Sequence, residues 1–458
     1  MAEQDSSRAC VAAASTRAMR ECDVLIIGGG PAGSTAGTLL AQRGHRVSLL
    51  EKARHPRFHI GESLLPANLP LLDKLGVAEA VRAMAMEKWG AEFVSPWHAQ
   101  RSQTFEFADA WDKSMPPSYE VRRSEFDEIL IRNTARQGAE VIEGCRATHV
   151  VFDRDDGVAT VEARHDDGRR DTWRARFVLD ASGRDTFLGK KFGTRRRNPR
   201  HNSSALYAHF SGAQRHPGRA AGNITVFWFE HGWFWFIPMA DGATSVGAVV
   251  WPHYLKTRSK PLEDFFHDTI ALCPALGARL RDAARITPVE ATGNFSYACD
   301  QTHGANYLLL GDAFSFIDPV FSSGVMLAMQ GGFCAADAVD TCLREPQRAR
   351  AALKRFDRQV RHGTRAFSWF IYRITTPTMR DLFMGPRNVL RVREALLSML
   401  AGDIFGTTPI WTSLFVLKGI YYAACVLHPR RSWQALRQRR TNIRAPQAVE
   451  AVARPGTR

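Results

Sequence analysis

Short apolar runs, separated by glycines and charged residues, mark the start of the chain. Residues 22–28 (CDVLIIG) are an apolar run bounded by glycines, which is typical of a strand buried in a parallel sheet. Residues 32–43 (AGSTAGTLLAQR) are expected to form a helix that ends at Gly44. Residues 46–50 (RVSLL) then read as a second strand, which ends at Glu51. The pattern predicts a βαβ unit.

Alternating apolar and polar positions predict antiparallel strands farther along the chain. Residues 158–176 alternate on both sides of a DDGR turn and predict a β-hairpin, which leads into the strand FVLD and the loop ASGRD. Four alternating stretches between residues 203 and 250 (SALYAHF, ITVFWFE, WFWFIPM and TSVGAVV) predict an antiparallel sheet. We expect this sheet to form a second layer inserted into the first domain.

Helices dominate the predicted C-terminal part. Residues 306–310 (NYLLL) form a strand that runs into a GDA sequence, and residues 323–342 are expected to form one long helix. Beyond residue 346 the chain is predicted to be helical and rich in arginine, with an apolar block at 409–428. That block has about the length needed to cross a bilayer. Because Lys418 lies in its middle, the sequence favours a buried or lid-forming helix over a membrane span.

Composition and charge limit the classes of function. The chain has 458 residues and is 45% hydrophobic, which is enough for one large enzyme or two or three domains. Its formal net charge is +15, but residues 429–458 hold eight arginines against one acid and therefore contribute +7. Such a segment suits nucleic acid, anionic lipid, an acidic protein or simply a solvated disordered end. Without a helix-turn-helix, zinc-finger or RNP-like pattern in the sequence, we predict no nucleic-acid partner.

Cysteine spacing and the N-terminus bear on compartment and metal content. The eight cysteines are scattered, with no CxxC pair and no His/Cys cluster at metal-binding spacing in the sequence, so we predict reduced thiols and no metal. Residues 1–20 mix acids with arginines and lack the apolar core of a secretory signal. We therefore predict a cytoplasmic protein.

A glycine motif lies at the turn of the predicted βαβ unit. Gly28, Gly30 and Gly33 form G-x-G-x-x-G directly after a strand and at the start of a helix, the context in which the motif binds a dinucleotide. Glycines let the backbone approach a pyrophosphate, and the helix N-terminus supplies free N–H groups. Glu51 can accept hydrogen bonds from the ribose hydroxyls, and its charge disfavours a 2′-phosphate. The alternative is a glycine-rich turn without a ligand.

Three later motifs favour FAD as the dinucleotide. Residues 121–127 (VRRSEFD) resemble the V-x-R-x-x-F-D segment of two-domain flavoproteins, in which Arg123 would face the cofactor. Asp180 begins a D-A-S-G element of that class, and Gly311-Asp312 resembles its late G-D motif, whose aspartate holds the ribityl chain. Singly, Arg123 could be a surface residue and Asp312 a helix cap. The sequence holds one nucleotide fingerprint, so FAD takes it and no second unit remains for NADPH. The candidate FAD ligands are Gly28, Gly30, Ala32, Gly33, Glu51, Lys52, Glu62, Ser63, Arg123, Asp180, Gly311 and Asp312.

These motifs assign a fold class to the predicted elements. We expect an α/β protein with a Rossmann-type FAD-binding domain of the two-domain flavin monooxygenase type, an inserted antiparallel β-sheet substrate domain and a helical C-terminal region. The expected divisions are a disordered tail at 1–20, the FAD-binding domain at 21–190 and 291–345, the substrate domain at 191–290, the helical region at 346–428 and a basic tail at 429–458.

Two further motifs resemble those of the flavin-dependent halogenases. Trp233-x-Trp235-x-Ile237-Pro238 matches the W-x-W-x-I-P motif of that family, and residues 316–324 (FIDPVFSSG) match its F-x-x-P-x-x-S-x-G motif. The lysine of the family follows a G-E-S segment, and here Gly61-Glu62-Ser63 is followed by Lys88. The likeness covers roughly residues 20–345, and the motifs occur in the family's order.

The resemblance implies a mechanism. Reduced FAD and O2 would give a flavin hydroperoxide that oxidises chloride or bromide to hypohalous acid, with the halide held by backbone N–H groups at Ser322, Ser323 and Gly324. Lys88 would then hold the hypohalous acid by a hydrogen bond or become an N-halo-amine, and either form presents an electrophilic halogen to an aromatic ring. The amine form requires burial that lowers the pKa of Lys88 from about 10.4. Without the motif, Lys88 would be read as a surface lysine.

The resemblance also bears on substrate and partners. The tryptophan-specific branch carries a catalytic glutamate in a P-L-E-S sequence, whereas Pro319 is followed here by Val320 and Phe321. The chain also has no room for the large extra cap of that branch. We therefore predict a phenol or pyrrole substrate, free or tethered to an acyl carrier protein. Carrier proteins are usually acidic and would complement the arginine-rich C-terminal region. A separate flavin reductase would supply the FADH2.

The aromatic stretch WFWFIP has two interpretations. Periodicity alone predicts a strand buried on both faces, with Trp233 and Trp235 on one face and Phe234 and Phe236 on the other. Among the flavin motifs, the two tryptophans are candidate active-site residues that separate flavin from substrate. Two alternatives stay open: an FAD hydroxylase or reductase of the same fold, and a membrane-associated binding protein that uses 409–428 and the basic tail. Peripheral membrane contact is not favoured.

Overall fold

The computed structural model describes residues 19–114, 117–153, 157–199, 201–293 and 296–444. The predicted disordered tail at 1–20 therefore lies almost entirely outside the described residues, and its last two residues belong to the first strand. The seven described cysteines are all free. No group of three potential metal ligands occurs within these described ranges.

The first layer is a seven-stranded sheet that carries the predicted βαβ unit. Its order is β7-β2-β1-β10-β9-β8, with β19 beside β10, and its neighbours are parallel except at the β10–β9–β8 meander. The predicted hairpin at 158–176 corresponds to β9 and β10. The strands are β1 (Met19–Ile27), β2 (Val47–Glu51), β7 (Glu140–Glu143), β8 (Cys145–Phe152), β9 (Ala159–His165), β10 (Arg170–Asp180) and β19 (Tyr307–Leu309).

Helices cover the parallel part of this sheet. Helix α1 packs against both α4 and α9, and the three bury alanines and leucines between them. Short helices surround this layer. The bounds are α1 (Pro31–Gln42), α2 (Leu69–Leu75), α3 (Ala78–Met84), α4 (Arg123–Arg136), α5 (Phe187–Lys191) and α9 (Ser323–Arg344). The predicted Rossmann-type arrangement of a parallel sheet with covering helices is confirmed.

The second layer is an eight-stranded sheet. Its order is β16-β12-β15-β14-β13-β4-β5, with β17 also beside β12. The four strands predicted between 203 and 250 are antiparallel neighbours, but β13 pairs with β4 in parallel, so residues 90–106 add two strands that the sequence did not indicate. The strands are β4 (Gly90–Ser95), β5 (Arg101–Glu106), β12 (Ser204–Ser211), β13 (Ile224–Phe229), β14 (Gly232–Pro238), β15 (Thr244–Val250), β16 (Ala284–Arg285) and β17 (Glu290–Thr292).

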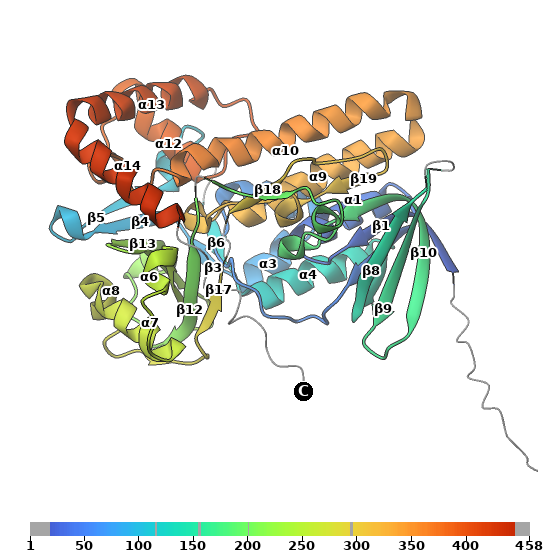
Figure 1. The fold of residues 1–458 in the computed structure, drawn as a ribbon, viewed down its shortest axis with the longest axis horizontal. Helices are drawn as coiled ribbons and strands as arrows, with labels where there is room; N and C mark the ends of the chain where they lie inside the picture. Colours follow the sequence, from blue (N-terminus) through green and yellow to red (C-terminus); the bar gives the residue numbers. More distant parts are fainter. Residues whose placement is uncertain (1–18, 115–116, 154–156, 200, 294–295, 445–458) are drawn as a thin grey trace, which may run out of the picture.

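Small sheets connect the two layers. A two-stranded ribbon consists of β3 (Met86–Lys88) and β6 (Ser118–Glu120). A three-stranded sheet has the order β11-β18-β20, formed by Arg195–Arg197, Tyr297–Cys299 and Ser315–Phe316. Helices α6 (Pro252–Leu255), α7 (Leu262–Ala271) and α8 (Pro274–Arg279) flank the second sheet. Figure 1 shows the first sheet and the second sheet at opposite ends of the molecule, with α9 and α10 extending between them.

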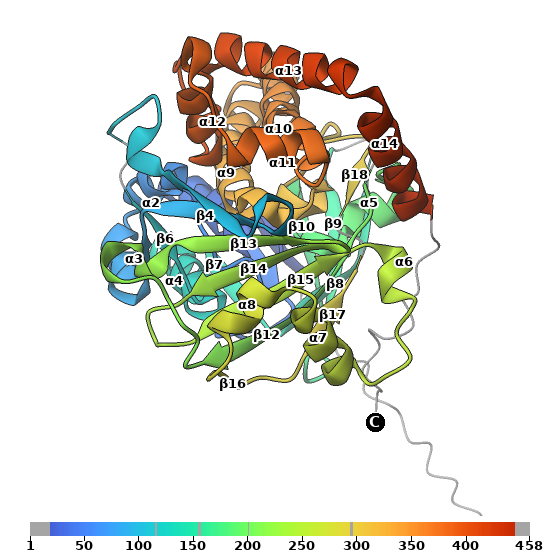
Figure 2. The ribbon, with the colours of Figure 1, turned by 90° about the vertical axis from the view of Figure 1, so that its left-hand side faces the viewer.

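The C-terminal helices cover one face of the second sheet. Figure 2 shows α11 to α14 above β4 and β13, while α7 and α8 lie on the other side. The bounds are α10 (Ala349–Ile371), α11 (Pro377–Met384), α12 (Val392–Leu400), α13 (Ile410–Leu427) and α14 (Pro429–Arg444). Residues 429–444, expected as part of a basic tail, are therefore helical and pack on α11, α13 and α6.

Helix α13 corresponds to the apolar block. It is the one helix among the described residues that is long and apolar enough to cross a membrane, and 28% of it is buried. Leu414, Leu417 and Tyr421 face the protein, whereas Phe415 and Val426 are each 76% exposed. The expected buried helix is thus buried on one side only.

Candidate active site

The glycine turn between β1 and α1 has the shape that a pyrophosphate requires. A Cβ atom on Gly28 would lie 2.3 Å from the Ala181 carbonyl oxygen, and one on Gly33 would lie 2.0 Å from the Gly28 carbonyl oxygen. Gly28 also has a φ of +107°. In front of Gly30, by contrast, the nearest atom to a Cβ would be the Arg57 side chain at 3.7 Å. Helix α1 has no side-chain cap and no acid in its first turn, so its N–H groups are available to an anion.

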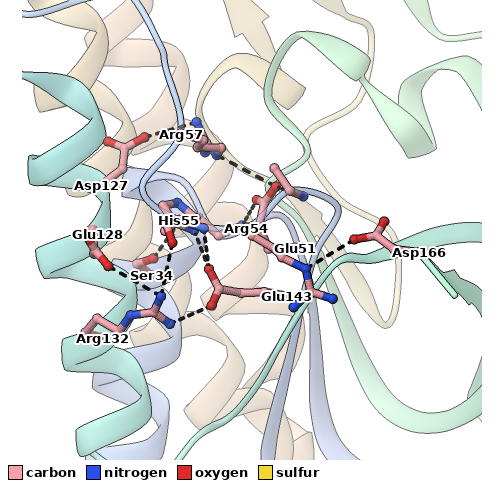
Figure 3. Close-up of polar contacts among 12 residues, drawn as sticks. Ser34, Glu51, Arg54, His55, Arg57, Asp127, Glu128, Arg132, Glu143 and Asp166 are labelled. Carbon is pink, nitrogen blue, oxygen red and sulfur yellow. Dashed lines mark hydrogen bonds and ion pairs between the residues drawn. The ribbon is translucent and has the colours of Figure 1, made fainter.

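The end of β2 supplies the acidic side of the nucleotide site. Glu51 accepts hydrogen bonds from the Gly29 N–H at 2.7 Å and the Ala53 N–H at 2.9 Å, and each carboxylate oxygen keeps a further lone pair for a ribose hydroxyl. Arg57 lies between Glu51 and Asp127 on α4 (Figure 3). Lys52 points away to an exposed ion pair with Asp185.

The segment after β2 is tied to α4 by buried charges. Arg123 donates to both oxygens of Asp127, at 2.8 and 3.0 Å, and to the Ile60 carbonyl at 2.8 Å. Burial alone would raise the pKa of Asp127, but the charge and hydrogen bonds of Arg123 outweigh burial and lower that pKa. Glu62 is the next acid along the segment. One of its carboxylate oxygens lies 2.9 Å from His209 Nε2 on β12, within hydrogen-bond distance. Arg123 therefore ties this segment to α4 of the first layer, and Glu62 ties it to the second sheet.

The late G-D motif, Gly311-Asp312, lies beside α9 and next to the glycine turn. A Cβ on Gly311 would lie 3.4 Å from the Ala32 Cβ atom, so α1 and the motif are in van der Waals range. Burial raises the pKa of Asp312 to about 6, although the charges of Arg184 and Arg123 oppose it. A carboxyl group in that setting is suited to hydroxyl donors such as a ribityl chain. Among the cofactor candidates, these residues fit FAD.

Asp180 has a different role in the geometry. It is fully buried, and it accepts hydrogen bonds from the Ser182 N–H at 3.0 Å and the Leu188 N–H at 2.7 Å. Its carboxylate thus shapes the loop whose Ala181 carbonyl lies against Gly28.

The predicted halide site is a turn at the start of α9. Phe321 ends a 3-10 turn and Ser322 takes the left-handed conformation with a φ of +55°. The Ser322 N–H donates to the Pro319 carbonyl at 2.8 Å, so the N–H groups of Ser323 and Gly324 at the start of α9 are the ones offered to an anion. Ser322 provides no side-chain cap to the helix, Ser323 is buried, and a Cβ atom on Gly324 would meet nothing within 4 Å. One cavity is lined by both Gly324 and Asp312, so this turn and the late FAD motif share a space.

A buried polar group that the sequence analysis missed anchors this turn. Asp318 accepts from the Val320 N–H at 3.3 Å, and its other oxygen lies 2.8 Å from His201 Nε2 and accepts from the Ser203 hydroxyl at 2.9 Å. His201 stacks on Tyr372 at the end of α10. The D in the FIDPVFSSG motif was the available sign of this anchor, but its partners lie more than a hundred residues away.

Lys88 is buried at the end of β3. Its side chain is 1% exposed, and its Nζ atom donates to Ser63 Oγ at 2.8 Å and to the Leu64 carbonyl. The Phe107 ring lies 5.5 Å away, and the Glu120 carboxylate lies at 3.8 Å. Burial lowers the pKa of Lys88, while Glu120 opposes this shift. A surface role for Lys88 is therefore excluded, and the burial that the amine form requires is present.

The tryptophans of β14 form one face of a two-sided strand. Trp233 and Trp235 belong to the same hydrophobic core as Val320 and Phe321 of the halide turn and buried residues of helices α10 to α13. The Trp235 Nε1 atom donates to Ser245 Oγ at 3.0 Å, and its ring lies over Gly247, where a Cβ would come within 2.1 Å. Phe234 and Phe236 pack into a separate core with α7 and α8. The strand is buried on both faces, as periodicity predicted.

Comparisons with known proteins agree with this arrangement. The family model described as FAD binding domain matches residues 21–364. A tryptophan 2-halogenase of Chondromyces crocatus is 34% identical over 332 residues, which are 70% of this chain and 61% of that protein. A 1H-pyrrole-2-carbonyl-peptidyl-carrier protein chlorinase of Pseudomonas fluorescens is 29% identical over 406 residues, which are 84% of this chain and 89% of that protein.

A solved structure extends the likeness to the fold. The myxobacterial chondrochloren halogenase CndH, described as a new variant of FAD-dependent halogenases, superposes with a TM-score of 0.74 at 33% identity. The match covers 86% of this chain and 93% of that chain. This chain belongs to the flavin-dependent halogenases.

Proposed function

We propose that the protein uses FADH2 to install chlorine or bromine on an electron-rich aromatic ring, with Lys88 delivering the halogen. The observation that carries the proposal is the buried Lys88, whose Nζ atom is held by two acceptors, Ser63 Oγ and the Leu64 carbonyl. Reduced FAD with O2 supplies the oxidising equivalents that turn halide into hypohalous acid. The turn at Ser322, Ser323 and Gly324 holds the halide through backbone N–H groups.

The site favours a phenol or a pyrrole over tryptophan as substrate. The positions after Pro319 hold Val320 and Phe321, which are both buried among apolar side chains. The one nearby acid in that motif, Asp318, is turned toward His201 and Ser203. A ring that is strongly activated by its own hydroxyl or nitrogen needs less help in losing a proton than an indole carbon does.

The assay that tests this proposal separates halogenation from oxygenation. The protein is incubated with a flavin reductase, FAD, O2, chloride or bromide, and a panel of phenols and pyrroles in free and carrier-bound form. Products that carry halogen isotope patterns are expected, and oxygenated products alone would establish a hydroxylase instead. Lys88→Ala should abolish halogenation while FAD binding persists. Lys260→Ala, at an exposed ion pair with Asp268, is the matched control and should change neither.

The separation of flavin and substrate by Trp233 and Trp235 has its own test. Trp235→Ala should lower the fraction of O2 consumption that is coupled to halide and raise the oxygenated fraction of product. Phe234→Ala removes a ring from the opposite face of the same strand and controls for loss of core packing. Wild-type product ratios in Trp235→Ala would leave the tryptophans with a packing role alone.

We also propose that the substrate is presented on an acidic carrier protein at the α13–α14 surface. Residues 410–444 contain Lys418 and six arginines but no acid. Exposed arginines on α14 lie next to the exposed apolar side of α13, which is the combination that a small acidic partner with an apolar contact would fit. The relative that acts on a pyrrole-carrying carrier protein matches over 84% of this chain, beyond the FAD-binding domain.

Charge reversal tests the carrier surface. R430E/R437E/R440E should raise the KM for a carrier-bound ring and leave the turnover of the free ring unchanged. The control R146E/R164E places the reversed charges on β8 and β9, at the opposite end of the molecule (Figure 1). An unchanged KM for the carrier-bound ring, or unchanged turnover after deletion of residues 429–458, would contradict the docking surface. Sedimentation of wild-type protein with anionic vesicles, without binding to carrier, would assign the surface to lipid.

A further inference from the structure

The number of hydrogen-bond acceptors around the Lys88 Nζ atom equals the number of N–H bonds in a neutral amine. Ser63 Oγ and the Leu64 carbonyl each accept one N–H bond from Nζ, and a neutral amine has two such bonds. An ammonium has a third N–H bond. Among the described residues, the remaining charged group near Nζ that could accept it is Glu120. Its nearest oxygen lies 3.8 Å from Nζ, beyond hydrogen-bond reach.

Glu120 is an unusual carboxylate for a folded protein. It is 0% exposed at the end of β6, where it bridges to Ser63. Neither of its oxygens has a well-formed hydrogen bond from a described donor, although the Ser63 hydroxyl is close enough to favour the ionised form. Buried polar atoms are almost always hydrogen-bonded, so a buried carboxylate whose two oxygens lack a well-formed hydrogen bond calls for an explanation.

A purely structural ion pair accounts poorly for this geometry. A buried pair repays its desolvation only when its geometry is close and its remaining oxygens are satisfied. Neither condition holds for Lys88 and Glu120. Burial instead raises the pKa of Glu120 to about 8 and lowers the pKa of Lys88, so the two groups approach each other in proton affinity.

We propose that Glu120 is the proton partner of Lys88, taking a proton from the ammonium and returning it during halogen transfer. This inference rests on the proposed function, because hypohalous acid is the reactant. Transfer of one proton gives a neutral amine beside a carboxylic acid, and this amine is already satisfied by its two acceptors.

The halogen-transfer step balances with one shuttled proton. The amine lone pair forms the N–X bond as the O–X bond of hypohalous acid breaks, and its electron pair leaves with oxygen. The departing hydroxide takes the proton of Glu120 and becomes water, and the N–H2X⁺ group returns a proton to Glu120. The net change is R–NH2 plus HOX giving R–NHX plus H2O.

Delivery to the substrate closes the cycle. The aromatic ring forms the C–X bond as the N–X bond breaks, and nitrogen takes the proton of Glu120. The ring then loses its own proton to the Glu120 carboxylate, which restores the neutral amine and the carboxylic acid. The groups that face Glu120 and influence its titration are Lys88 on β3 and Glu62, whose charge raises the pKa and which His209 on β12 holds.

The direct test bypasses the flavin chemistry. FAD-loaded protein is mixed with a stoichiometric amount of hypochlorous acid, and chlorination of the Lys88 peptide is measured by mass spectrometry after rapid quenching. Glu120→Gln keeps the shape but cannot exchange the proton, and we expect chlorination of Lys88 to slow by about 100-fold, the low end for a positioned acid–base group. Glu92→Gln is the matched control, because Glu92 is also a buried carboxylate but is paired with Arg279 and His216.

Turnover provides a second readout. Wild-type halogenation should fall on the alkaline side in the region of pH 8, where Glu120 loses the shared proton, and Glu120→Gln should lack this limb. Glu120→Gln should still consume reduced FAD and halide. It should release more hypohalous acid into solution, which is measured as halogenation of an added 1,3-diketone that traps the acid. If Glu120→Gln fails to fold, Glu120→Asp should fold and show slower chlorination with a shifted limb.

The outcomes separate this inference from the proposed function. If the wild type makes no halogenated product, the proposed function fails whatever Glu120 does. If the wild type halogenates and Glu120→Gln has the same chlorination rate and the same pH profile, the proton role of Glu120 is overturned and Lys88 acts alone.

Discussion

Two buried cation–carboxylate pairs flank the segment at residues 60–65, and they are built in different ways. Arg123 and Asp127 share two hydrogen bonds of 2.8 and 3.0 Å within one turn of α4. Lys88 and Glu120 face each other across the β3–β6 ribbon at 3.8 Å, without a hydrogen bond between them. Both pairs are almost fully buried, so exposure to solvent does not distinguish them.

The difference lies in what each pair does to its proton. Arg123 lowers the pKa of Asp127 against the effect of burial, so that pair holds its charges firmly. Lys88 fails to offset burial for Glu120, whose pKa rises to about 8. A tight pair fixes the backbone that shapes the FAD site, whereas a loose pair leaves a proton free to move. A buried cation–carboxylate pair thus stabilises the structure at Arg123–Asp127, whereas at Lys88–Glu120 we expect it to take part in the reaction.

Breaking the tight pair should have the largest effect. Asp127→Asn leaves the Arg123 guanidinium buried without its counter-charge, and the free energy of unfolding should fall by roughly 3–5 kcal/mol. FAD affinity should fall with it, because Arg123 also holds the Ile60 carbonyl. Urea unfolding and flavin fluorescence titration measure the two effects.

An exposed pair serves as the control for that substitution. Asp268→Asn removes the surface partner of Lys260 and should change the free energy of unfolding by less than about 1 kcal/mol. Near-wild-type stability of Asp127→Asn would remove the distinction between the two buried pairs.

Breaking the loose pair should spare stability and remove activity. Lys88→Met keeps an unbranched apolar side chain in the same space, and Glu120 without its cation stays protonated in the folded state. We expect halogenation to fall by at least about 100-fold, the scale of a lost acid–base group, while the free energy of unfolding changes much less than in Asp127→Asn. Product analysis and urea unfolding on the same preparation test this. A stability loss as large as that of Asp127→Asn would place both pairs in the structural class.

The pH dependence of stability should differ in sign between the pairs. Asp127 has a lowered pKa in the fold, so its contribution is present above its ordinary pKa of 3.8 and is lost as the pH falls through the lower folded value. Glu120 has a raised pKa, so its carboxyl group keeps a proton in the fold that it loses in the unfolded chain, and its own contribution to stability falls as the pH rises from 4.5 to about 8. Glu120→Gln should therefore flatten the unfolding free energy in that window, and a profile parallel to wild type would contradict the raised pKa.

The contrast also shows what the sequence could and could not predict. Arg123 was identifiable because V-x-R-x-x-F-D is contiguous, and its partner Asp127 lies in the same motif one helical turn later. Lys88 was identifiable only through its distance from Gly61-Glu62-Ser63. Glu120 directly precedes the same motif, yet nothing local marks it, because its relation to Lys88 exists only once β3 and β6 pair.

Long-range pairing explains the other differences from the prediction. The turn and strand patterns that give the βαβ unit are local, and they were predicted correctly. Strands β4 and β5 belong to the second sheet through the parallel pairing of Ile224 with Ala91, which no local period reveals. Helix α14 was missed because arginines dominate residues 429–444, and its packing on α11 and α13 is tertiary.

The smallest change distinguishes two roles for Ser63. The sequence placed Ser63 among the FAD ligands, whereas in the structure its hydroxyl accepts an N–H bond from Lys88 at 2.8 Å. Ser63→Ala should lower the free energy of unfolding by about 1 kcal/mol and halogenation by a few-fold, because the Lys88 amine keeps one of its two acceptors. If the hydroxyl serves Lys88 alone, FAD affinity measured by fluorescence will match wild type. If Ser63→Ala binds FAD more weakly while chlorination of Lys88 is unchanged, Ser63 acts as an FAD ligand, as the sequence predicted.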